Sequence, residues 1–247
     1  MKTLTLIMGL LLYFPLSGHP QQTERNFIPM IGDNAPHFVA ESTQGTINFP
    51  GDFGKNWKII FSHPQDFTPV CSSEILELAS MQREFENLDA RLIVISTDKL
   101  ETHFSWKEAM EEIDFKGRGK RKIYFPFVDD NDYSISSLYG MHHPNAKRGT
   151  NIRGVFYVDR NDKIRAIQYY PNEVGRSTDE ILRTLLALQM SDDNFDYKIP
   201  ANWQPGEPLM VGHTNPQMIE NMQLESPIYF QYSWFMIYWK NNDSNGE

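Results

Sequence analysis

Residues 57–75 read WKIIFSHPQDFTPVCSSEI and join an apolar segment to the only cysteine of the chain. The run Trp57–Ser62 is short, apolar and bounded by turn residues, which is typical of a buried strand. From Cys71 to Leu88 the apolar residues fall at helical spacing, with Glu and Gln on the other face, and this predicts a helix. Cys71 is therefore expected at the start of a helix that follows a core strand.

The rest of the chain alternates strands with helices. Further strands are predicted over 46–49, 91–96, 153–159 and 163–170, with another ending at 127–128, and helices are predicted over 100–113 and 178–190. This alternation indicates an α/β sheet with helices on both faces. After residue 191 prolines punctuate an irregular segment that ends in an aromatic tail, so we expect a domain boundary near 191–200.

The composition is that of a globular protein, with 40% hydrophobic and 22% charged residues in a chain of 247. It excludes collagen-like, low-complexity and wholly disordered classes. There are 23 basic and 32 acidic side chains, giving a formal charge of −9. This charge argues against nucleic acid as a partner, because phosphate binding needs clustered Lys and Arg. A single cysteine excludes an intramolecular disulfide and a zinc site with several thiolates.

The first twenty residues have the layout of a secretory signal. Lys2 precedes an apolar run over 4–14, and the small residue Gly18 follows a helix break. The run is too short for a membrane span, which needs about 20 residues. We expect residues 1–20 to be a signal peptide, and the protein to be secreted or luminal, with no stable membrane span after cleavage. An uncleaved anchor and an organelle import signal are the alternatives.

The position of Cys71 suggests a reactive sulfur. Backbone N–H groups in the first turn of a helix are unsatisfied and carry partial positive charge, which stabilises a thiolate. Thr68 lies three residues before the cysteine, close enough to hydrogen-bond the sulfur, while Pro64 and Pro69 fix the loop and limit access of water. A guanidinium would complete such a site, and Arg153 opens a core strand of the same predicted sheet.

Pro64, Thr68 and Cys71 form the pattern Pro-x-x-x-Thr-x-x-Cys, and in this the sequence resembles the peroxiredoxin family. Arg153 matches that family's active-site arginine. The resemblance covers roughly residues 29–213. Outside the motif, the stretches that match the family are Gly-Asp-Asn-Ala-Pro-His-Phe at 32–38, Val-Gly-Arg at 174–176 and Pro-Ala-Asn-Trp-Gln-Pro-Gly at 200–206. The last of these, with residues 62–71, points to the one-cysteine, peroxiredoxin-6-like subfamily.

This resemblance implies a thioredoxin-like fold with a smaller C-terminal peroxiredoxin dimerisation domain. We place the peroxidase domain at 27–192, the C-terminal domain and aromatic tail at 193–240, and a disordered end at 241–247. The tail between residues 228 and 239 contains seven aromatic side chains. Exposed, it would favour aggregation. We therefore expect it to be buried, either on its own domain or across a dimer. The resemblance implies packing of the C-terminal region over a partner subunit, so we predict an obligate homodimer.

The resemblance also implies a reaction. The thiolate of Cys71 attacks hydrogen peroxide or an organic hydroperoxide and becomes a sulfenic acid. Thr68, Arg153 and the N–H of Cys71 stabilise the sulfur and the breaking O–O bond. Glu74 and Arg176 are expected to orient Arg153. His63 either binds peroxide or influences the thiolate, but a core histidine is an equal alternative.

No cofactor or metal is implied, and the absence of a second cysteine means that the sulfenic acid must be reduced from outside, by a small thiol or a redox protein. A different class of function is also open: a secreted or luminal chaperone or host-interaction protein with incidental peroxidase activity. A thioredoxin-type disulfide oxidoreductase needs Cys-x-x-Cys, whereas Ser72, Ser73 and Glu74 follow Cys71.

Weaker signals are set aside. Asn56 stands where a lipase-type element of some family members has its serine, and an amide is no nucleophile, so lipase activity is not expected. The basic run at 117–122 is interpreted as a solvated loop. His142-His143 lacks metal-ligand spacing, and 129–140 lacks the glycine and glutamate of a calcium loop. Asn242 begins a glycosylation sequon, usable if the chain enters the secretory pathway.

Overall fold

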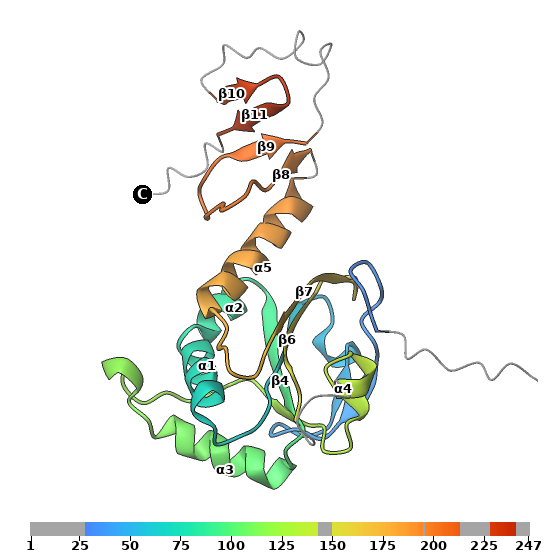
Figure 1. Ribbon diagram of the computed structural model, residues 1–247, viewed down its shortest axis with the longest axis vertical. Helices are drawn as coiled ribbons and strands as arrows, with labels where there is room; N and C mark the ends of the chain where they lie inside the picture. The colour runs from blue at the N-terminus through green and yellow to red at the C-terminus, as the bar shows by residue number, and fades with distance from the viewer. Residues whose placement is uncertain (1–27, 143–149, 195, 213–227, 241–247) are drawn as a thin grey trace, which may run out of the picture.

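Five strands form the central sheet of the computed structural model, which describes residues 28–142, 150–194, 196–212 and 228–240 (Figure 1). In spatial order they are β5 (Phe127–Asp129), β4 (Ala90–Ser96), β3 (Trp57–Ser62), β6 (Arg153–Val158) and β7 (Ile164–Tyr170). β3 runs parallel to β4, and β4 runs parallel to β5, whereas β6 is antiparallel to both β3 and β7. The predicted strands and the β6–β7 hairpin are therefore confirmed.

The alternation of side chains along β3 divides the core into two layers. Ile59 and Phe61 point to one face and Ile60 to the other. The first face is covered by α1 (Pro69–Ser80), α2 (Gln82–Asn87), α3 (Leu100–Glu111) and α5 (Thr178–Asp193). The second is covered by the hairpin of β1 (Phe38–Ala40) and β2 (Ile47–Phe49) and by α4 (Ser134–Leu138). Both faces are thus covered as predicted, although the second carries only one short helix.

The helix predicted from Cys71 to Leu88 is two helices. α1 begins two residues earlier, at Pro69, because a proline fits the first helical position, where its missing N–H is not needed. It ends at Ser80, and Met81 leaves helical geometry before α2 starts. The short 3-10 helices η1 (Gly51–Phe53) and η2 (Phe115–Gly117) were not predicted. Cys71 is consequently the third residue of its helix rather than the first.

A second, four-stranded sheet lies beyond the C-terminal end of α5 (Figure 1). Its order is β10 (Tyr229–Ser233), β11 (Met236–Trp239), β9 (Leu209–Val211) and β8 (Tyr197–Lys198). The aromatic tail forms β10 and β11, but within one chain it is buried on one side only. Ile237 is 1% exposed, while Tyr232 is 76% exposed and Phe235 58%. The predicted burial on its own domain is therefore incomplete, and burial across a dimer stays a prediction.

Several predicted features lie outside the described residues: the signal at 1–20, His143, Asn242 and the end at 241–247. Among the helices that are described, none combines the length and apolarity needed to cross a membrane. The basic run around 117–122 is exposed, and Lys120 and Lys122 pair there with Glu112 and Glu111.

Candidate active site

Cys71 is fully buried in the first turn of α1. Thr68 is the N-cap, and Pro69 has no N–H, so the N–H groups of Val70 and Cys71 are the donors that the helix itself leaves free. Their partial positive charge, added to that of the helix dipole, favours an anion at this end of the helix. The sulfur therefore occupies a position that stabilises a thiolate.

Arg153 faces the sulfur from the first residue of β6. Its Nη1 lies 3.2 Å from Cys71 Sγ and 2.7 Å from Glu74 Oε2. Its Nε and Nη2 donate to the backbone oxygen of Asn172, at 3.0 and 2.6 Å. Arg153 is 2% exposed, and contacts with Cys71, Glu74 and Asn172 hold its guanidinium beside the sulfur. The placement of Arg153 at the cysteine agrees with the sequence expectation.

Glu74 and Arg176 hold Arg153 in place through a buried network. Glu74 accepts from Arg176 N and Nε through Oε1, at 2.7 and 2.9 Å, and from Arg176 Nη2 through Oε2, at 2.9 Å. Arg176 also donates to Gly154 O and stacks 3.3 Å above the centre of the Phe61 ring. Burial raises the pKa of Glu74, but the bonds from Arg176 and the charge of Arg153 outweigh it and hold that pKa below its ordinary value.

Thr68 departs from the expectation. Its hydroxyl donates to the backbone oxygen of Gln65 at 2.9 Å, and no described contact joins it to Sγ. Phe67 adopts a left-handed φ of 54°, which closes this loop into a turn and brings the Gln65 oxygen beside Thr68. A hydroxyl has one proton, so Thr68 in this position accepts hydrogen bonds but does not donate to a thiolate. Pro64 is buried in the same loop.

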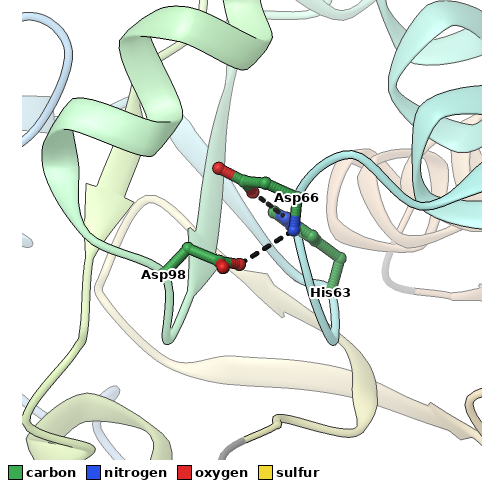
Figure 2. A group of neighbouring side chains, drawn as sticks. All are labelled: His63, Asp66 and Asp98. Carbon is green, nitrogen blue, oxygen red and sulfur yellow. Dashed lines mark hydrogen bonds and ion pairs between the residues drawn. The ribbon is translucent and has the colours of Figure 1, made fainter.

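His63 belongs to a second buried network (Figure 2). Its Nε2 lies 2.7 Å from Asp66 Oδ1, and the other oxygen of Asp66 lies 2.6 Å from Nδ1 of His103 on α3. The His63 ring packs against Trp106 at 5.0 Å between centroids, and the Trp106 indole donates to the hydroxyl of Ser72, the neighbour of Cys71. No hydrogen bond between His63 and Sγ occurs in the described part of the chain.

Protonation within this network follows from burial and pairing. Burial lowers the pKa of His63, and the bond to Asp66 does not compensate. Burial raises the pKa of Asp66, but hydrogen bonds from His103 and His63 outweigh it, so that pKa lies below its ordinary value. At neutral pH Asp66 is therefore a carboxylate and His63 a neutral ring.

Sequence reasoning missed Asp66, His103 and Asn172. Asp66 stands inside the motif block, where it could have been singled out as a carboxylate next to His63. His103 is 37 residues away from Asp66 in sequence. The spacing of apolar residues predicts one buried face for its helix, but it does not show which loop that face contacts. Asn172 contributes only a backbone oxygen, and no residue pattern marks such a role.

His63, Asp66 and Asp98 are close enough together to suggest a metal site. Hydrogen bonds already occupy both carboxylates, however, and within this cluster only the buried Nδ1 of His63 lacks a partner among the described residues. Both oxygens of Asp66 face imidazole rings, one of His63 and one of His103. Asp98 Oδ2 accepts from Asp66 N at 2.8 Å (Figure 2). A metal needs the lone pairs of these carboxylates directed at itself. The cluster is a hydrogen-bond network, and the chemistry of the site centres on Cys71.

Comparison with known proteins agrees with this geometry. Residues 31–167 match the AhpC/TSA family, and residues 187–225 match the C-terminal domain of 1-Cys peroxiredoxin. A peroxiredoxin of Methanosarcina mazei is 44% identical over 187 residues, covering 74% of this chain and 84% of its own length. The chain belongs to the peroxiredoxin family. It is a thiol peroxidase, an oxidoreductase with a single cysteine, and the matches give no support to the chaperone or host-interaction alternative.

Solved structures of peroxiredoxins share the fold. A yeast mitochondrial 1-Cys peroxiredoxin superimposes with a TM-score of 0.74 at 32% identity, covering 87% of this chain and all of the other. A peroxiredoxin 6 of Arenicola marina superimposes with a TM-score of 0.75 at 26% identity, covering 86% and 99%. The thioredoxin-like fold with an additional C-terminal domain, expected from the sequence, is thus confirmed.

Proposed function

We propose that Cys71 is the nucleophile that cleaves the peroxide bond. The thiolate attacks the terminal oxygen of a hydroperoxide ROOH, so that an S–O bond forms as the O–O bond breaks. Cys71 becomes a sulfenic acid that keeps the transferred hydroxyl. The leaving alkoxide takes from solvent the proton that the Cys71 thiol released on ionising, and departs as ROH, or as water when the substrate is hydrogen peroxide. The observation that carries this proposal is the 3.2 Å contact between Arg153 Nη1 and a buried sulfur at the start of α1.

Arg153 acts as a prearranged electrostatic group. Because Glu74 and the Asn172 oxygen already hold the guanidinium, it need not reorganise as charge moves from the sulfur to the leaving oxygen. The N–H of Cys71 donates in the same region, and the oxygen of Thr68 accepts from the hydroxyl of the peroxide. Pro64 shapes the buried wall that excludes water.

We propose further that the sulfenic acid is reduced by an external thiol. The first thiol RSH displaces water and leaves a mixed disulfide on Cys71, and a second thiol releases Cys71 and carries away the disulfide. The single cysteine supports this route, because no second thiol of the chain is available. For the yeast neighbour, the reported resolving mechanism involves glutathione and thioredoxin systems.

Two further proposals concern assembly and location. The match to a 1-Cys peroxiredoxin C-terminal domain and the half-exposed aromatic tail support a homodimer. The basic and apolar layout of residues 1–20 supports entry into the secretory pathway. Mass determination of the native protein tests entry into the secretory pathway, since an intact Met1 would contradict cleavage of a signal peptide.

The catalytic proposal is tested by product analysis. Reduced protein is mixed with one equivalent of hydrogen peroxide, and a sulfenic-acid probe is located by mass spectrometry. We expect modification at Cys71 and none in Cys71→Ser, together with continued peroxide consumption only when a thiol is supplied. Peroxide consumption by Cys71→Ser would contradict the assignment, and turnover without thiol would contradict the external reductant.

A further inference from the structure

The Asp66 carboxylate lies between two imidazole rings that come from different elements. His63 follows β3, and His103 lies on α3, and all three side chains are buried. The oxygens of Asp66 are 2.7 Å from His63 Nε2 and 2.6 Å from His103 Nδ1. One carboxylate therefore fixes the orientation of both rings.

The positions of the protons follow from the partners. His103 Nε2 lies 3.2 Å from the backbone oxygen of Val128, which can only accept, so Nε2 carries a proton. Its Nδ1 faces an ionised carboxylate, which is an acceptor as well. With an acceptor at each ring nitrogen, this geometry favours a proton on both nitrogens of His103, whose positive charge would then face the negative charge of Asp66. His63 donates through Nε2 to the same carboxylate.

This leaves Nδ1 of His63 with a lone pair and no hydrogen-bond partner among the described residues. The ring packs against Trp106, whose indole donates to Ser72 next to Cys71, so these contacts link the ring that carries the free acceptor to the helical turn that holds the reactive sulfur. A buried acceptor without a partner is unfavourable unless a ligand supplies the donor. The hydroxyl of a hydroperoxide, or of the sulfenic acid formed from it, is such a donor.

We propose that Asp66 and His103 are positioning residues that keep His63 neutral, with its proton on Nε2 and a free lone pair on Nδ1, for the peroxidase reaction at Cys71. This inference rests on the proposed function. Asp66 supplies the acceptor for Nε2–H, and His103 supplies the positive charge that prevents the carboxylate from drawing a second proton onto His63. Asp66, Asp98 and His103 are the titratable groups that act on His63.

Nitrogen NMR of the histidine rings in the reduced full-length protein tests the protonation pattern without any variant. At pH 7 we expect His103 to have protons on both nitrogens and His63 only on Nε2. A neutral His103, or a proton on Nδ1 of His63, would overturn the proposal even if the peroxidase reaction is confirmed. Absence of peroxidase activity in the unmodified protein would instead refute the function and leave this pattern readable.

Two variants test the consequence for the reaction. Asp66→Asn replaces one accepting oxygen with a donating NH2, and we expect oxidation of Cys71 to slow about tenfold or more, with a changed His63 tautomer. In His103→Gln the carboxylate keeps its charge without a cation, so His63 binds a proton more readily. Oxidation should then fall between pH 8 and pH 6 more steeply than alkylation of Cys71, which reports ionisation of the sulfur itself.

Asp192→Asn is the matched control, because Asp192 is an ion-paired carboxylate near the far end of α5. It should leave both the rate and the tautomer unchanged. If Asp66→Asn fails to fold, the pH profile of His103→Gln and the NMR spectrum of the unmodified protein still test the positioning role. Unchanged oxidation in a folded Asp66→Asn, or parallel oxidation and alkylation profiles in His103→Gln, would overturn the positioning role.

Discussion

Arg153 has one nitrogen that contacts both the sulfur and a carboxylate, and two others on a backbone oxygen. This geometry needs a planar guanidinium, because an ammonium has one nitrogen and cannot serve Cys71, Glu74 and Asn172 together. We therefore predict that Arg153→Lys, although it keeps the charge, slows oxidation of Cys71 by about a hundredfold. Stopped-flow fluorescence measures the rate. Oxidation within twofold of the unmodified protein would contradict a specific role for the guanidinium.

Thr68 offers an acceptor oxygen and not a proton, since its hydroxyl is bonded to Gln65 O. Thr68→Val keeps the shape of the side chain but removes both the hydrogen bond to Gln65 O and the acceptor oxygen. We predict that this lowers the free energy of unfolding by about 1 kcal/mol and slows oxidation of Cys71 by a factor of about five. Thr68→Ser retains the hydroxyl and serves as the control. Equal rates in the two variants would show that the hydroxyl does not take part.

Glu74 compensates two buried cations, and removing its charge leaves them unpaired. We predict that Glu74→Gln lowers the free energy of unfolding at pH 7 by about 3–5 kcal/mol. The pKa of Glu74 in the folded protein lies below its ordinary value of 4.5. Its carboxylate therefore stabilises the folded protein to the full extent at pH values above 4.5. The difference between the two proteins should therefore shrink as the pH falls below 4.5.

Urea unfolding at pH 7 and pH 3.5 measures that difference. Glu86→Gln is the control, because Glu86 is an exposed carboxylate on α2. A deficit for Glu74→Gln that stays constant with pH would mean that its ionisation does not support the fold.

At the scale of elements, β6 must approach β3 closely for Arg153 to reach α1. Gly154 allows this, since its N–H donates to Ser62 Oγ at 2.8 Å and an added Cβ would lie 3.2 Å from that oxygen and 3.3 Å from Met141 Sδ. We predict that Gly154→Ala destabilises the protein by about 1–3 kcal/mol and also slows oxidation of Cys71. Gly51→Ala, whose Cβ would meet only ordinary contacts at 3.5 Å, should be neutral in both thermal unfolding and rate.

Elements with a strong pattern could be predicted, and their ends and contacts could not. The core strands followed from short apolar runs, and Cys71 at a helix start followed from the strand, the prolines and the helical spacing. The break at Met81 was missed because apolar spacing continues through it from Leu78 to Phe85. The periodic spacing of apolar residues shows which face of a helix is buried, but it does not reveal a single residue whose backbone is not helical.

The site was predictable where a motif carried it. Cys71 and Arg153 are 82 positions apart; the start of a core strand made Arg153 a candidate, and the family resemblance assigned it to the site. The Asp66–His103 pair joins a loop to the buried face of a helix, and the sequence of either segment does not specify its partner. The direction of the Thr68 hydroxyl depends on the left-handed turn at Phe67, which an aromatic residue does not signal.

At the scale of the whole molecule, the exposed aromatic side of the β10–β11 hairpin is expected to be the dimer contact. Trp234 is 56% exposed and Phe235 58%. Replacing both with serine should convert the homodimer to monomers, measured by light scattering after gel filtration. Tyr124→Ser, at a side chain 62% exposed on the main domain, should leave the dimer intact. A dimer that survives loss of both tail aromatics would refute the role of the tail.

The most direct test of the central claim is the second-order rate constant for oxidation of Cys71 by hydrogen peroxide at pH 7, measured by stopped flow on the reduced protein. The site predicts a rate at least about a hundredfold above that of a free cysteine under the same conditions, because a stabilised thiolate meets a fixed guanidinium. A rate equal to that of the free amino acid would contradict the claim that Cys71 and Arg153 form a peroxide-cleaving site.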